Sequence, residues 1–111
     1  MPKLEEWILA EAKDEPVEAV VIGNMGWPDC GLEELPVESQ DRSKWNRVLS
    51  WDEARPLLQY EFESGYGAPS CQAITAWTAN KVIFVSQYDG ATGIESVPRN
   101  PVDHVPTMPG G

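Results

Sequence analysis

Cysteine, histidine and acidic side chains are the residue types that could form a metal site or a nucleophilic centre here. The two cysteines, Cys30 and Cys71, lie 41 positions apart, and the single histidine, His104, follows Asp103 in a proline-rich stretch. A zinc site needs three or four such ligands on rigid elements, and a cysteine nucleophile needs a base within hydrogen-bond distance. Nothing in this spacing requires either arrangement. We therefore expect no metal, no cofactor and no catalytic residue, and we expect both thiols to be ordinary buried groups.

The glycines at positions 23 and 26 follow an apolar run, as they would in a nucleotide-binding loop. Such a loop also needs a third glycine or a Lys-Ser/Thr pair that leads into a helix, and both are missing. A tight turn explains these glycines better. One alternative function stays open at this stage: a small enzyme or ligand-binding domain, with a pocket between the 23–31 loop and the 89–93 turn.

Acidic charge is the most unusual property of the chain. Its 111 residues carry 18 acids and 8 bases, a formal charge of −10. Residues 1–38 hold ten of these acids and two bases, so their share is −8. Such a surface repels nucleic acids and anionic membranes and attracts basic partners. We expect no direct nucleic-acid binding and no membrane binding.

Trp27 stands apart from the other tryptophans because it lies in the glycine-rich 23–31 loop, among acids. An aromatic anchor ringed by carboxylates is typical of an interface for a basic partner. The alternative is that Trp27 folds back to plug the core. On the first interpretation, the partner-binding residues are Trp27, Asp29, Glu33, Glu34 and Glu38.

These observations predict a non-enzymatic binding protein that docks a negative surface on a basic macromolecular site. An inhibitor, immunity or anti-defence protein of a phage or bacterium fits, as does a mimic of nucleic acid that occupies a protein's nucleic-acid-binding site. A homo-oligomeric subunit that assembles through a sheet edge is a further alternative. The idea depends on the acids of residues 1–38 forming one coherent outward patch.

The only basic cluster spans Arg42 to Arg47 and encloses Trp45. Trp45 could stack on a nucleobase, but a few bases on a strongly negative surface bind nucleic acid weakly. We expect these basic side chains to pair with the protein's own acids or to lie in solvent on a helical turn.

Two helices are expected. Residues 2–13 place Leu4, Ile8 and Ala12 on one stripe after Pro2, which suits the first helical position. Ser50 with Glu53 forms a capping-box pattern that starts a second helix at Trp51, and Pro56 should kink or shorten it.

The remaining elements are strands and a tail. Residues 17–22 form a short β-branched run, and its consecutive apolar residues Val20, Val21 and Ile22 predict a strand inside the sheet. Segments 71–78, 81–88 and 94–97, separated by short turns, predict an antiparallel meander. We expect Trp7, Trp51 and Trp77 to build the core.

The fold class that follows is α+β, with a small antiparallel sheet of three or four strands and two helices packed on one face. Residues 1–97 form one compact domain, and the Pro/Gly-rich residues 98–111 form a C-terminal tail that wraps the surface or is disordered. The acidic N-terminus lacks the basic and apolar regions of a signal peptide, so we expect a cytoplasmic protein.

Overall fold

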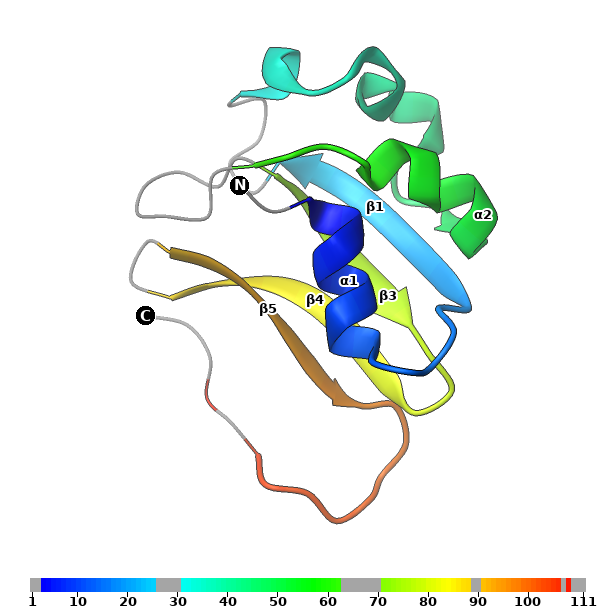
Figure 1. The fold of residues 1–111 in the computed structure, drawn as a ribbon, viewed down its shortest axis with the longest axis vertical. Coiled ribbons are helices and arrows are strands. Elements are labelled where there is room, and N and C mark those ends of the chain that lie inside the picture. Colours follow the sequence, from blue (N-terminus) through cyan, green and yellow to red (C-terminus); the bar gives the residue numbers. More distant parts are fainter. Residues whose placement is uncertain (1–2, 26–30, 63–70, 89–90, 107, 109–111) are drawn as a thin grey trace.

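A five-stranded antiparallel sheet organises the molecule, in the order β2-β1-β3-β4-β5 (Figure 1). The computed structural model describes residues 3–25, 31–62, 71–88, 91–106 and 108. The strands are β1 (Ala19–Met25), β2 (Val48–Leu49), β3 (Gln72–Trp77), β4 (Lys81–Tyr88) and β5 (Ala91–Pro98). The predicted α+β class is confirmed, with five strands in place of three or four.

The predicted meander is confirmed as β3, β4 and β5, and the first strand lies inside the sheet between β2 and β3. The expected five-residue turn at 89–93 is wrong, because Ala91 already pairs with Tyr88 and residues 91–93 belong to β5. β1 also runs further than the apolar run predicted, to Met25, with a register irregularity between Ile22 and Met25.

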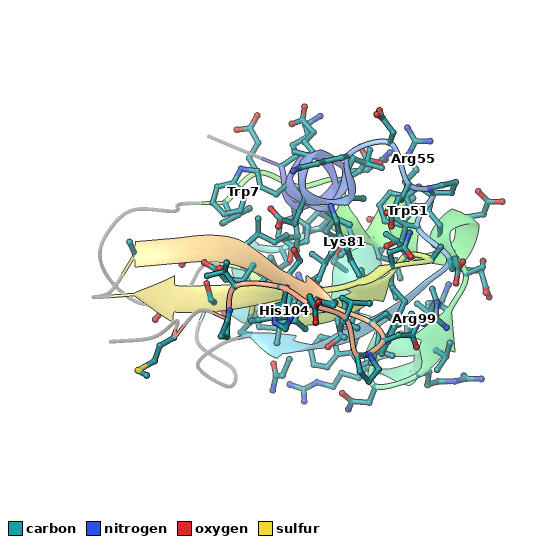
Figure 2. All side chains as sticks on the ribbon, turned by 90° about the horizontal axis from the view of Figure 1, so that it is seen from below. Trp7, Trp51, Arg55, Lys81, Arg99 and His104 are labelled. Carbon is teal, nitrogen blue, oxygen red and sulfur yellow. The ribbon has the colours of Figure 1, made fainter. Side chains whose placement is uncertain are left out.

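Helix α1 (Leu4–Ala12) packs on one face of the sheet because its apolar stripe is continuous. Leu4, Ile8 and Ala12 are completely buried, as predicted. At the end of the helix, the Lys81 Nζ donates to the Glu11 carbonyl oxygen at 2.9 Å, where a cation is favoured by the helix dipole. Figure 2 shows α1 on one side of β4 and β5.

The second helix, α2 (Trp51–Ala54), begins with the predicted capping box. Glu53 N–H donates to the Ser50 hydroxyl, and the Ser50 N–H donates to the Glu53 carboxylate. The helix is short and continues as a 3₁₀ turn, η4 (Arg55–Leu58), because Pro56 offers no N–H for a further α-helical bond.

Residues between β1 and α2 form three 3₁₀ turns, η1 (Leu32–Glu34), η2 (Val37–Gln40) and η3 (Arg42–Lys44), before β2. Between β1 and β2, the described residues thus contain 3₁₀ turns that are only three or four residues long.

The two faces of the sheet differ. Ala76 and Ile83 pair across β3 and β4, are fully buried and point toward the helices. Since side chains alternate along a strand, their neighbours Trp77 and Val82 point to the opposite face, where both are only half-buried. The expectation that Trp77 is part of the main core is therefore wrong. Trp7 and Trp51 pack at the margin of that core.

The tail is fixed to the sheet at its first residues. Pro98 is the last residue of β5 and pairs with Lys81 of β4. The Arg99 guanidinium donates to Glu18 and to the Thr78 carbonyl oxygen. Residues 99–106 then run outside β5 as exposed chain without regular secondary structure (Figure 1). Among the described residues, no helix has the length and apolar character needed to cross a membrane.

Candidate functional site

A buried polar network ties the 3₁₀ segment to the sheet. The fully buried Gln72 side chain donates through Nε2 to the carbonyl oxygens of Gly23 (3.2 Å) and Ser39 (3.3 Å). Its Oε1 accepts from the Tyr60 hydroxyl at 3.1 Å, and its backbone N–H donates to the same hydroxyl. Burial raises the pKa of Tyr60, so this hydroxyl stays protonated as a donor.

Trp45 is the second anchor of this segment. Its indole Nε1 donates to the Ser39 carbonyl oxygen at 3.0 Å, and the Ser39 hydroxyl donates to the Leu57 carbonyl oxygen at 2.7 Å. Trp45 is only 7% exposed, and the Arg42 guanidinium lies 5.1 Å from its ring centroid. The tryptophan is thus part of the core, where its ring is not available for stacking on a nucleobase.

The acidic segment, residues 32–41, lies on these anchors. Its buried side chains are Leu35 and Ser39, while Glu33, Glu34 and Glu38 are exposed. Within the described part of the chain, these three carboxylates make no hydrogen bond and no ion pair. They are therefore exposed to solvent, on a backbone that hydrogen bonds from Gln72 and Trp45 to the Ser39 carbonyl oxygen hold in place.

Val37 lies between these acids and is 82% exposed. Sequence reasoning did not select it, although a valine between Pro36 and Glu38 in an irregular acidic stretch was the available signal. At the end of the segment, hydrogen bonds from the Ser43 hydroxyl and N–H lower the pKa of Asp41. Trp27 and Asp29, the other two predicted partner-binding residues, lie outside the described residues.

Other acids of residues 1–38 are bonded inside the protein. The Glu5 carboxylate accepts from Arg55 at 2.6 Å and from Gln59 at 2.9 Å. Burial alone would raise the pKa of Glu5, but these hydrogen bonds and the charges of Arg55 and Lys3 together lower it. Three further acids bond across the fold to β-sheet or turn residues: Glu11 to Ser96, Glu15 to Thr78 and Asn80, and Glu18 to Arg99.

The expectation that the acids of residues 1–38 form one coherent outward patch is therefore wrong, because several of them bond inside the protein. Most acids of α1 and of the turn after it form hydrogen bonds with other parts of the fold, over the middle of the sheet. The acids of η1 and η2 lie beyond β1 (Figure 1). The part of the predicted site that the structure describes is therefore the acidic segment.

Among the described residues, the side chains that could do chemistry are not brought together. Cys71 is 1% exposed, and burial raises the pKa of its thiol to about 12. His104 lies exposed on the tail, where its Nδ1 is 3.1 Å from the Val102 carbonyl oxygen (Figure 2). Among the described residues no group of three His, Cys, Asp or Glu side chains could hold a metal ion. Cys30 lies outside the described residues.

Two shallow hollows flank β1 and β2. One, of about 210 Å³, includes Gly23 and Asn46, so Gly23 belongs to a strand and not to a phosphate-binding turn. The other, of about 360 Å³, has Lys44 and Arg47 among its lining residues together with Asp52 and Glu53, so its charges oppose one another. The 26–30 and 89–90 parts of the alternative pocket lie outside the described residues.

The candidate site is therefore an exposed acidic segment on a rigid, fully hydrogen-bonded support. Every buried side-chain nitrogen and oxygen in the described part of the molecule has a hydrogen-bond partner. No protein-family model, no curated protein and no solved structure matches this chain.

Proposed function

We propose that this chain is a non-enzymatic binding protein that docks its acidic segment on a basic site of another protein. The observation that carries the proposal is the set of three exposed carboxylates, Glu33, Glu34 and Glu38, without partners among the described residues. Four other acids of the N-terminal region, Glu5, Glu11, Glu15 and Glu18, satisfy the fold's own donors. These three are left available to an external cation.

The segment's support favours this role. An interface that is already ordered before binding loses less conformational entropy on association. Leu35 and Ser39 of the segment are buried, and so is the neighbouring Trp45, so the backbone of the segment is held although it contains only 3₁₀ turns. The exposed Val37 supplies an apolar contact at the centre, with carboxylates around it, as in an interface with a polar rim.

Charge should determine how the partner is reached. With a formal charge of −10, the protein is drawn to positive surfaces at long range, and salt screens this attraction. A narrower form of the proposal is an inhibitor, immunity or anti-defence protein of a phage or bacterium, acting in the cytoplasm. Its target would be a basic groove that otherwise binds nucleic acid.

The test compares the wild-type chain with the variant Glu33→Gln/Glu34→Gln/Glu38→Gln in pull-downs from bacterial lysate. Binding is measured at about 0.05 M and about 0.5 M salt, where screening lengths differ roughly threefold. We expect a basic protein that the wild type retains at low salt and releases at high salt. The triple variant should lose that protein at both salt concentrations.

The matched control is Glu6→Gln/Asp14→Asn/Glu61→Gln, which removes the same charge from exposed acids outside the segment. This control should still retain the same protein, because it leaves the acidic segment intact. If the control and the site variant lose the protein equally, binding depends on net charge alone and the proposed site is wrong. If no basic protein is retained at low salt, the proposed function itself is refuted.

A further inference from the structure

The face of the sheet that points away from α1 and α2 carries a largely apolar surface, interrupted by Thr75 and Glu95, the two residues that pair with Phe84. Alternation along the strands places on it Val21, Trp77, Val82, Phe84 and Val97. None of the five belongs to the hydrophobic core, and Val97 is 43% exposed. We call these five residues the open face.

The C-terminal tail carries a second apolar surface. Val102 is 59% exposed, Val105 86% and Met108 95%. They recur every third residue, among prolines at 101, 106 and 109. A proline-rich chain favours the polyproline II conformation, which has three residues per turn, so in that conformation the three side chains line one side. We call these three residues the tail ridge.

The start of the tail is fixed. The Arg99 N–H donates to the Asn80 carbonyl oxygen at 2.9 Å, and its guanidinium bonds both Glu18 and the Thr78 carbonyl oxygen. Residue 99 is thus held at the sheet, near the turn between β3 and β4. From there the tail runs outside β5, and the ridge is left in solvent (Figure 1).

We propose that two copies of this chain form a dimer by exchanging tails, with the tail ridge of each copy lying across the open face of the other. A single chain leaves the tail ridge exposed and the open face half-buried with Val97 exposed, and the exchange covers the two surfaces together. The arrangement is reciprocal, so it closes as a two-fold dimer.

The dimensions allow this contact. Residues 100–108 span about 28 Å at roughly 3.1 Å per residue. Five strands spaced about 4.8 Å apart give a sheet about 19 Å wide. One tail therefore reaches across every strand of the partner. A stable interface buries roughly 1,200–2,000 Å² in total. The dimer has two equivalent contacts between a tail and a sheet, so each contact must bury about half of that area.

Charge also favours the tail as the contacting element. Residues 100–111 contain one acid and no Lys or Arg, in a chain of formal charge −10. A second copy meets less repulsion here than at the acidic segment. Because the contact is apolar and the two copies repel each other overall, higher salt should strengthen the dimer, opposite to the salt response of the proposed function.

The test is light-scattering mass measurement over a range from about 10 µM to about 500 µM, which covers micromolar dissociation constants. We expect the mass to rise with concentration from 12.3 kDa toward twice that value. The variant Val105→Glu/Met108→Glu, in an exposed part of the tail, should remain near 12.3 kDa throughout. On the open face, Val97→Glu should do the same.

Two further samples complete the test. Val37→Glu places the same charge at an exposed valine outside both surfaces and should dimerise at least half as tightly as wild type. A mixture of the tail variant with Val97→Glu should regain part of the dimer, because one supplies an intact face and the other an intact tail.

A wild-type mass that stays at 12.3 kDa throughout overturns the proposal, whether the tail folds onto its own face or binds a different protein. A tail variant that dimerises as well as wild type also overturns it, since assembly would then use another surface such as the β5 edge. Circular dichroism confirms that Val97→Glu is folded, and the tail variant carries the test if it is not.

Discussion

Replacing Gln72 by leucine should be among the most damaging single changes of a polar residue in this protein. The side chain is fully buried and makes three hydrogen bonds, to Tyr60, Gly23 and Ser39. Leucine has a similar volume, so no large cavity forms. The substitution leaves the Tyr60 hydroxyl without its acceptor and the Gly23 carbonyl without this donor, at the irregular point of the β1–β3 pairing.

The magnitude follows from the three lost bonds. Each neutral hydrogen bond contributes about 0.5–1.5 kcal/mol, and an unsatisfied buried group adds to that loss. We expect Gln72→Leu to lower the free energy of unfolding by about 3 kcal/mol. For a domain of this size, urea denaturation followed by tryptophan fluorescence measures such a change, provided that unfolding is two-state.

A double-mutant cycle with Tyr60→Phe isolates the interaction between the two side chains. Tyr60→Phe alone removes two hydrogen bonds and should cost about 2 kcal/mol. The double variant should lose about 1 kcal/mol less than the sum, because the two changes share one bond. The control Gln87→Leu removes a single bond to Thr92 from a half-buried position and should cost about 1 kcal/mol or less. The reasoning is refuted if Gln72→Leu costs no more than this control.

Three further predictions concern other parts of the fold. Ser50→Ala removes the capping box with Glu53 and should cost about 1 kcal/mol in urea denaturation. Cys71 should resist alkylation in the native protein at neutral pH, because burial raises the pKa of its thiol to about 12; peptide mapping that finds rapid labelling without denaturant would contradict this. The pKa of Glu5 is lowered from its ordinary value of 4.5, so its contribution with Arg55 is complete above pH 4.5 and is lost as pH falls through the folded-state value. Glu5→Gln should consequently weaken the fall of the urea midpoint with acid, and an unchanged pH profile would argue against this role.

Local patterns predicted the regular elements well. The apolar stripe of α1, the Ser50 cap and the turn between β3 and β4 each arise from neighbouring residues, so the sequence contains the whole signal. The turn at 89–93 was predicted too long, because residues 91–93 pair with β4. β2 has only two residues, so it has no periodic pattern from which a strand could be predicted, and its pairing with β1 is a tertiary contact. β1 continues through Gly23 and Asn24, whose types favour turns, because pairing with β2 and β3 and the Gln72 bond to Gly23 outweigh that preference.

For the acidic segment, too, the sequence predicted what depends on neighbouring residues and missed what depends on distant ones. Exposure of Glu33, Glu34 and Glu38 follows from their charge in an irregular stretch. The burial of Trp45 and the internal bonding of Glu5 did not follow, because each depends on a partner far away in the sequence: the Ser39–Gln72–Tyr60 network for one, Arg55 and Gln59 for the other. The charge of a carboxylate is visible in the sequence, but whether that carboxylate points into solvent or bonds another side chain of the protein is decided by the tertiary fold.

Experiments can separate the effect of the buried network that supports the acidic segment from the effect of the segment's own charge. Glu33, Glu34 and Glu38 make no intramolecular bonds among the described residues, so neutralising them should leave stability unchanged or raise it slightly through reduced repulsion. Loss of Gln72 should lower stability and loosen the segment while leaving its charge intact. If binding falls in both variants but stability falls only in the second, the segment acts as a preorganised charged surface. If the loosened segment binds as well as the rigid one, its order has no role in recognition and attraction by charge alone is sufficient.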